Sequence, residues 1–326
     1  MRALVTIFLC ACFPVRFAIA QSLAGPIESF TFDELTRSLR AVRGIPGSAT
    51  LGPAVVTDVT FGTAAPSRNY GIILQQDHFF FVSALDANNV ISKPISGIFA
   101  RPDGAAWSTD GSFAVLFSRA SRWVQTITGL PNNPKVNPHQ NLAVLGGELC
   151  GVAVRATSSD FAVAMCGRQA GVYLNTSNQQ FAPVPGMMNP IAVAFSEDGE
   201  TLYVWDGGLQ KLAAVRVSDL AIQHFSVSGL HNPTAVQTGH DASNSPLVYL
   251  ASRSDGALDV YNPSSGKVIQ KISLTFQPEG IQAFGHSSFL LSSRLRLTDP
   301  IWLLETSPKP AVYFVPAMQG SEKGAR

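Results

Sequence analysis

Three observations predict an all-β fold in which four-stranded sheets repeat around a common axis, as in a β-propeller. Pairs of short strands recur along the chain, and the second strands of these pairs begin 43, 48, 40, 46 and 41 residues apart. A period of about 44 residues with four strands per unit is typical of a propeller blade. Charged residues form only 14% of the chain, which also contains 27 glycines and 21 prolines. This composition suits short strands and turns better than long amphipathic helices.

The clearest repeat is the stretch NPIAVAFSEDGETLYVWD, residues 189–206. Ile191, Val193 and Phe195 alternate with small residues, as expected for a half-buried strand. Gly199 allows the following turn to adopt a positive φ without steric cost. A second strand rich in β-branched and aromatic residues then returns, so the stretch predicts a β-hairpin.

Five further stretches match this hairpin, which gives six full repeats. Several first strands begin with a proline followed by small residues, and proline at a strand start removes no ladder hydrogen bond. Residues 131–146 are the least regular part and indicate a weak outer strand or a loop. The expected second strands are Gly71–Leu74, Ala114–Phe117, Ala162–Met165, Leu202–Trp205, Val248–Ala251 and Phe289–Ser292.

The segment 30–40 fits the outer hairpin of a repeat and is counted as an N-terminal half repeat. The alternative is a short helix with Thr31 as its N-cap and Glu34 completing a capping box. An open ring would expose sheet edges and an apolar face. The half repeat is therefore expected to close the ring, either as a partial seventh blade or as strands added to the last blade. The prediction is six full repeats plus an N-terminal half repeat, in six or seven blades.

Residues 1–20 have the pattern of a secretory signal peptide. Arg2 precedes a mostly apolar run, and Ala18-Ile19-Ala20 forms a small-x-small cleavage site. The apolar run is shorter than the ~20 residues of a membrane-spanning helix. An alternative interpretation is lipoprotein processing at Cys12, which would give a lipid-anchored chain. The expected organisation is a signal peptide (1–20), one propeller domain (21–317) and a disordered tail (318–326) in a secreted or periplasmic protein.

The charge balance and the missing motifs exclude several classes of function. Loss of Arg2 and Arg16 with the signal peptide reduces 23 basic residues to 21, against 22 acidic residues. This balance argues against binding to nucleic acid or an anionic membrane, because both use a basic face. The sequence has no further transmembrane stretch and no nucleophile-elbow, zinc-protease, nucleotide-binding or EF-hand motif. We therefore expect no metal and no cofactor.

Cys150 and Cys166 are the cysteines that remain after removal of residues 1–20. They lie in one predicted hairpin whose turn is at 157–159, and residue 158 is midway between them. Opposed residues on paired strands lie ~4.5–5.5 Å apart between Cα atoms, within disulfide range. We expect a disulfide in an exported protein. The alternative is a pair of buried thiols that pack as small apolar groups.

The P-x-[AG]-[VI] strand starts, the STDG and SEDG turns and the LYV strand resemble the YVTN, NHL and WD-type β-propeller repeats of exported proteins. The resemblance covers residues 50–317, although the Gly-His and Trp-Asp pairs of WD repeats are absent at their expected spacing. It implies a propeller architecture. Some propellers of this kind resemble sugar-lactone hydrolases and others are binding platforms, and the fold alone does not choose between them.

In a propeller, the segments that lead into the first strands and the loops between second and third strands share one face. Four units carry a small residue and then an arginine in this loop, so we call this side the arginine-bearing face. Guanidinium groups bind carboxylate or phosphate in a bidentate manner, which favours an anion or acidic-glycan site. The alternative is that each arginine bonds loop carbonyls or an acid such as Asp206 or Asp255. The candidate ligand-binding residues are Arg119, Arg168, Arg253, Arg294, Asn189 and Asn232.

Glu148 and Glu279 are both near the start of a first strand on the same face. One of these carboxylates could act as a catalytic base with His231 as its partner, and the alternative is that all three side chains lie in solvated loops. The expected function is an exported binding or interaction module for a protein partner or for an anionic small-molecule or glycan ligand. A lactonase-like hydrolase with a site at the channel mouth and a structural envelope protein are the alternatives, so the sequence leaves open whether the protein is an enzyme.

Overall fold

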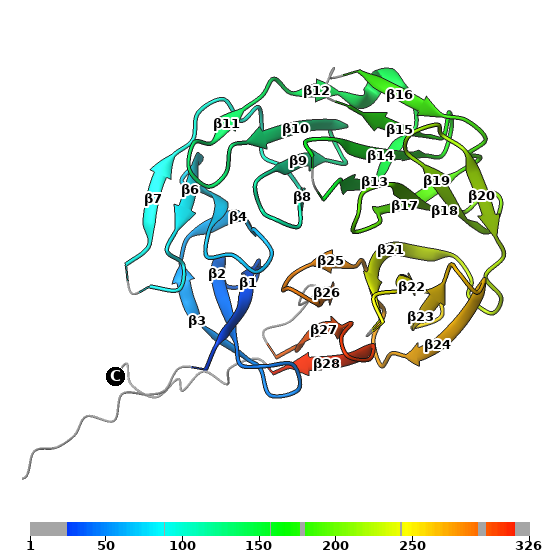
Figure 1. Cartoon of the computed structure of the whole chain (residues 1–326). Helices are drawn as coiled ribbons and strands as arrows, with labels where there is room; N and C mark the ends of the chain where they lie inside the picture. The colour runs from blue at the N-terminus through cyan, green and yellow to red at the C-terminus, as the bar shows by residue number, and fades with distance from the viewer. Residues whose placement is uncertain are drawn as a thin grey trace, which may run out of the picture.

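The computed structural model describes residues 25–87, 89–156, 158–176, 180–241, 243–292 and 298–316. Within these ranges the chain forms seven antiparallel sheets that follow one another around a ring (Figure 1). A single short 3₁₀ helix, η1 (Leu142–Leu145), interrupts the all-β architecture of the described residues. The predicted all-β propeller is therefore confirmed. The predicted signal peptide, Cys12 and the tail at 318–326 lie outside the described residues.

Five of the seven sheets have four strands in sequential order. They are blade 2, with β4 (Val59–Ala64), β5 (Gly71–Gln75), β6 (His78–Ser83) and β7 (Ile91–Pro94); blade 4, with β13 (Glu148–Val154), β14 (Phe161–Cys166), β15 (Gly171–Asn175) and β16 (Phe181–Val184); blade 5, with β17 (Pro190–Phe195), β18 (Thr201–Asp206), β19 (Lys211–Arg216) and β20 (Ile222–Phe225); blade 6, with β21 (Pro233–His240), β22 (Pro246–Ser252), β23 (Ala257–Asn262) and β24 (Lys267–Ser273); and blade 7, with β25 (Gln282–Ala283), β26 (Ser288–Ser292), β27 (Ile301–Glu305) and β28 (Ala311–Val315).

Blades 1 and 3 depart from the four-stranded pattern. Blade 3 has two short outer strands that both pair with the third strand, which agrees with the irregular sequence at 131–146. Its strands are β8 (Gly104–Trp107), β9 (Ala114–Ser118), β10 (Trp123–Thr128), β11 (Lys135–Val136) and β12 (Gln140–Asn141). Blade 1 has three strands, β1 (Ile27–Asp33), β2 (Ser38–Arg43) and β3 (Thr50–Val56).

The N-terminal half repeat is a blade of its own, and the alternative of a helix at 30–40 is wrong. The loop between β1 and β2 meets the start of β4, where Val59 N donates to Arg37 O at 2.8 Å. Loops between second and third strands of other blades meet the next blade in the same way, so β1–β3 occupy the positions of second to fourth strands. Among the described residues nothing fills the first-strand position of blade 1. Ser67 N of blade 2 instead donates to Phe284 O of blade 7 at 3.1 Å.

Seven apolar clusters hold the ring together, one at each contact between neighbouring blades. The cluster that joins blades 7 and 1 contains Val42, Leu51, Ile301 and Leu303, all buried. Among the residues that the structure describes, the ring therefore closes by burial of apolar side chains, the dominant favourable contribution to folding, and not by a sheet shared between the first and last blades. The part of the chain that the structure describes contains no helix with the length and apolar character of a membrane span.

Candidate functional site

The arginine-bearing face is where the loops between second and third strands meet the segments that lead into the next blade. Gly167 N donates to Asn189 Oδ1 at 2.8 Å, which joins blade 4 to blade 5. Gln210 Nε2 donates to Asn232 Oδ1 at 3.3 Å, which joins blade 5 to blade 6. Both candidate asparagines therefore use their side-chain oxygen to hold neighbouring blades together, while Asn232 also lines a hollow described below.

A β-bulge recurs near the start of the first strand in four blades, at Thr60, Cys150, Ile191 and Thr234. A bulge inserts one extra residue opposite a single partner residue. The hydroxyls of Thr60 and Thr234 donate to carbonyls of the second strand, Leu74 O and Ala251 O, at 3.2 and 3.3 Å. In blades 2 and 6 the bulge residue of the first strand therefore binds the second strand directly.

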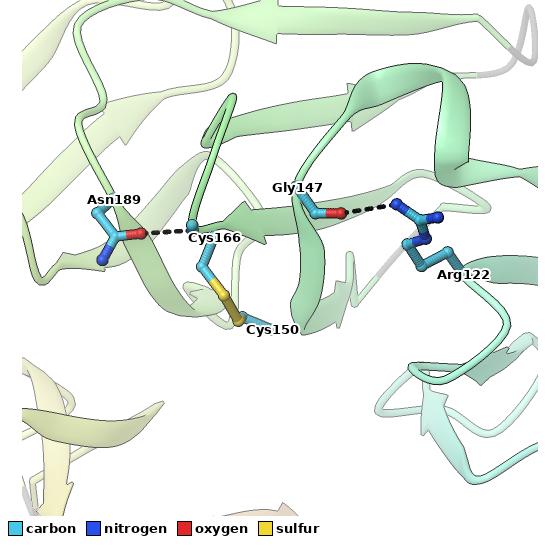
Figure 2. Close-up of a disulfide and its surroundings, with 6 residues drawn as sticks. Arg122, Gly147, Cys150, Cys166 and Asn189 are labelled. Atoms are coloured by element: carbon cyan, nitrogen blue, oxygen red, sulfur yellow. Dashed lines mark hydrogen bonds between the residues drawn. A yellow bond between two sulfur atoms is a disulfide. The ribbon is translucent and has the colours of Figure 1, made fainter.

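In blade 4 the bulge residue and the end of the second strand are the two cysteines. Cys150 and Cys166 are at disulfide distance, with their Cα atoms 5.9 Å apart and their sulfur atoms joined (Figure 2). The ladder pairs Cys166 with Glu148 and not with Cys150. The residue pairing predicted from the sequence was therefore wrong, because it did not include the bulge at Cys150. The prediction that the two cysteines lie within disulfide range was nevertheless correct, because the bulge brings Cys150 back to the partner strand.

The carboxylates of three aspartates on this face accept hydrogen bonds from backbone N–H groups. Asp206 is fully buried and accepts from Met188 N, Asn189 N, Gly208 N and Leu209 N at 2.7–3.1 Å. Asp103 accepts from Arg119 N at 2.7 Å, and Asp255 accepts from His231 N at 2.7 Å. In the last case this bond holds the pKa of Asp255 below its usual value. Each carboxylate fixes a loop of the face.

The predicted arginines differ in their surroundings. Arg119 pairs with Asp103 at 3.7 Å and lies over the ring of Phe117, 5.0 Å from its centroid. Arg253 lies 3.9 Å from Glu279 Oε1 of the next blade, and both side chains are about half exposed. Arg168 is exposed and makes no ion pair with any described residue. The alternative of acidic partners therefore holds for two arginines, although those partners are not Asp206 or Asp255. Arg294 lies outside the described residues.

A hollow of about 370 Å³ opens on the arginine-bearing face at the junction of blades 6 and 7. Its lining residues come from the segment that leads into blade 6, the loop after β22 and the segment that leads into blade 7. Arg253 supplies the positive charge, and the other residues carry amides and hydroxyls. The hydroxyls of Thr234 and Ser254 donate to Ala251 O and His231 O. The lining residues are Asn232, Thr234, Arg253, Ser254 and Gln277.

Two lining residues were predicted from the sequence and three were missed. Asn232 and Arg253 were candidates, whereas Thr234, Ser254 and Gln277 were not. Thr234 is the bulge residue of blade 6, and bulges leave no distinct signal in a single sequence. Ser254 directly follows Arg253, so its position next to the predicted arginine was the available signal.

The three candidate catalytic residues are only partly brought together. Glu279 lies near Arg253, and His231 Nδ1 lies 3.6 Å from Asp255 Oδ1. Glu148 is exposed in blade 4, and blade 5 separates it from the hollow. No hydrogen bond or ion pair links Glu148 to the other two within the described ranges. Those ranges also hold no group of three or more His, Cys, Asp or Glu residues placed to bind a metal ion.

Comparison with known proteins supports the architecture. No protein-family model matches the sequence, and no curated protein matches it. A functionally unknown protein from Desulfotomaculum acetoxidans DSM 771 is similar in structure, with a TM-score of 0.55, 14% identity and coverage of 76% of this chain and 78% of that one. The structure of U3-55K gives a TM-score of 0.53 at 10% identity and covers 79% of this chain and 82% of that one. At these identities the similarity shows the fold alone, a seven-bladed β-propeller.

Proposed function

We propose that this protein is an exported binding module of the YVTN, NHL and WD-like type whose arginine-bearing face receives an anionic ligand or the acidic surface of a partner. The hollow between blades 6 and 7 is its central contact. The observation that carries this proposal is the position of the exposed Arg253 side chain at an open hollow that Asn232, Thr234, Ser254 and Gln277 also line. Amide and hydroxyl groups beside a guanidinium suit a ligand that combines a carboxylate with hydroxyls, such as an acidic sugar.

The ion pair of Arg253 does not oppose this proposal. At 3.9 Å, with both side chains about half exposed, the contact with Glu279 is long and open to water. Such exposed pairs contribute only ~0–1 kcal/mol. A ligand carboxylate that binds Arg253 in a bidentate manner would form shorter, charge-assisted hydrogen bonds, so the exchange of Glu279 for ligand is favourable.

Export is part of the proposal and is supported by the sequence pattern of residues 1–20 and by the joined cysteines of blade 4. Disulfides persist in oxidising compartments. N-terminal sequencing of the protein recovered from the periplasm or medium is expected to begin at Gln21. A mature protein that begins at Met1, or at a lipid-modified Cys12, would overturn secretion by this route.

The binding test uses calorimetry with galacturonate oligomers and with neutral galactose oligomers of the same length. Wild type is expected to bind the acidic oligomers and not the neutral ones. Arg253→Gln is expected to lose about 10-fold or more in affinity, because a hydrogen bond to a charged group contributes ~1.5–3 kcal/mol. Raising the salt concentration is expected to weaken binding, since exposed charges are screened.

Arg216→Gln is the matched control. Arg216 is the exposed last residue of β19 and pairs at 2.9 Å with Asp219 in the loop that follows, away from the hollow. It removes the same charge from the protein, so it is expected to leave the affinity unchanged. Equal binding by the two variants, or equal binding of acidic and neutral oligomers, would refute an anion site at Arg253.

A further inference from the structure

Asp259, on β23 of blade 6, carries a buried carboxyl group. The residue is 1% exposed, and neither carboxylate oxygen has a hydrogen-bond partner among the residues that the structure describes. Its strand neighbours Ala257 and Tyr261 belong to the apolar cluster shared with blade 5. Because side chains alternate along a strand, Asp259 faces the same interface. Native structures pair most buried polar groups, and an exception of this kind calls for an explanation.

The cation of the neighbouring strand, Lys271, donates its hydrogen bond to a different acceptor. Lys271 on β24 is directly opposite Asp259 in the antiparallel ladder. Directly opposed side chains project from the same face of the sheet, with Cβ atoms ~4.5–5.5 Å apart. The Lys271 ammonium nevertheless donates to Gly229 O at 2.7 Å. Gly229 belongs to the segment 226–232 that leads from blade 5 into blade 6, so this bond ties the outer strand of blade 6 to that segment.

The same segment carries part of the candidate site. Val227 and Leu230 anchor it in the interface between blades 5 and 6, where both are buried. His231 and Asn232 follow directly, and Asn232 lines the hollow. Asn232 is only three residues after Gly229, so a change in the hydrogen bond to Gly229 O would affect a residue that lines the hollow.

One ammonium group thus has two possible acceptors, a carbonyl on the segment and a buried carboxyl on its own sheet. We propose that Asp259 and Lys271 form a pH-dependent switch that controls how firmly the segment 226–232 is held beside the hollow. When Asp259 is neutral, Lys271 binds Gly229 O, which is the arrangement in this structure. When Asp259 ionises, its carboxylate competes for Lys271, because an unpaired buried charge is far more costly than an unmatched surface carbonyl.

Apart from Lys271, the surroundings of Asp259 favour the neutral, protonated form of its carboxyl group at acid pH. Burial raises the pKa of Asp259, Lys271 lowers it and Asp255 raises it. On the facing side, burial raises the pKa values of Tyr203 and Tyr261, so neither adds a charge near neutral pH. Trp205 Nε1 of blade 5 is also buried and has no hydrogen-bond partner within the described part of the chain, but its N–H carries no titratable proton in this range. His231 is mostly exposed and pairs with Asp255.

The direct test is hydrogen exchange of the segment 226–232, followed by mass spectrometry between about pH 5 and about pH 9, a range that spans ordinary histidine and raised carboxyl pKa values. Rates are corrected for the intrinsic effect of pH, and the protein is used as the full mature chain. The segment 185–190 of blade 5, which Asp206 holds by backbone contacts, is the internal reference. Wild type is expected to lose protection at 226–232, relative to that reference, as the pH rises.

Two variants make the switch falsifiable. Asp259→Asn cannot ionise, so its segment is expected to stay protected across the range, while His231 remains present in both proteins. Lys271→Met keeps most of the side-chain volume but cannot donate a hydrogen bond to either acceptor, so its segment is expected to be poorly protected at every pH. If Asp259→Asn follows the wild-type profile, or if Lys271→Met retains the wild-type protection, the switch is wrong.

The expected effect of the switch on ligand binding rests on the proposed function. The experiments distinguish failure of the switch from failure of the proposed function. With galacturonate oligomers as the probe, wild-type affinity is expected to fall severalfold as the pH rises, and Asp259→Asn is expected to show no such fall. If no oligomer binds to any variant but the exchange profiles behave as expected, the proposed ligand class is wrong and the switch stands. If oligomers bind but the exchange profiles of wild type and Asp259→Asn coincide, the switch is wrong and the binding site stands.

Discussion

Replacement of Asp206 by alanine is expected to be among the most destabilising single changes on the arginine-bearing face. The Asp206 carboxylate is fully buried and accepts four backbone N–H groups, two from the segment that leads into blade 5 and two from its own loop. Removal of the carboxylate leaves all four donors without their acceptor at once.

The expected loss follows from these contacts. A hydrogen bond to a charged group contributes ~1.5–3 kcal/mol net, and a buried donor left unpaired costs ~1–3 kcal/mol. Met188 and Gly208 are exposed residues, so water can reach some of the released N–H groups. With four donors at the lower limit of the unpaired-donor cost, the total is about 4 kcal/mol, and we expect a loss of about 3–5 kcal/mol in the free energy of unfolding.

Urea unfolding followed by far-UV circular dichroism measures this loss, and Asp103→Ala is the matched control. Asp103 lies in the segment that leads into blade 3 and accepts from Ser118 Oγ, Arg119 N and Ala120 N, but its side chain is 40% exposed. Water can take the place of the Asp103 carboxylate, so removal of this carboxylate is expected to cost about 1 kcal/mol. A loss below about 1 kcal/mol for Asp206→Ala, or equal losses for both variants, would refute the role assigned to burial.

Three further predictions concern other parts of the ring. Replacement of both Cys150 and Cys166 by serine is expected to lower the free energy of unfolding by ~2–3 kcal/mol, the usual effect for a loop of this length, and to abolish any effect of dithiothreitol on the urea midpoint. Thr63→Val removes the acceptor of the buried Trp107 Nε1–H, bonded at 2.8 Å between blades 2 and 3, and is expected to cost ~1–3 kcal/mol; a neutral result in thermal unfolding would contradict it. Asp259→Asn is expected to be more stable than wild type above the raised pKa of Asp259, because wild type then buries a charge. This advantage is expected to vanish as the pH falls and the wild-type carboxyl binds a proton; a constant difference in Tm across pH would disprove it.

Local sequence patterns were sufficient for the blades themselves. The stretches that predicted second strands fall within β5, β9, β14, β18, β22 and β26. Strand formation depends on alternation and turn residues within about ten positions, and both are visible in one sequence. The period then predicts a closed ring, because each repeat has to bury its two faces against neighbours.

The candidate site could be predicted only in part. The loop position of Arg253 follows from the repeat, and so does the position of Asn232 in the segment that leads into blade 6. The contacts that decide what each group is free to do join residues far apart in sequence. Glu279, which leads into blade 7, contacts Arg253 of blade 6, and Asp206 accepts hydrogen bonds from the backbone of residues 188 and 189. Such partners are not encoded in any local pattern.

The sequence by itself thus determined the repeat, the all-β class and the short distance between Cys150 and Cys166, because alternation and turn chemistry act over a few residues. Only the tertiary structure decided how the ring closes, which strand carries a bulge and why Asp206 holds a loop while Asp259 is left unpaired. These features depend on which strands become neighbours and on how completely water is excluded between them. Contact and burial of that kind arise only when the whole ring has formed.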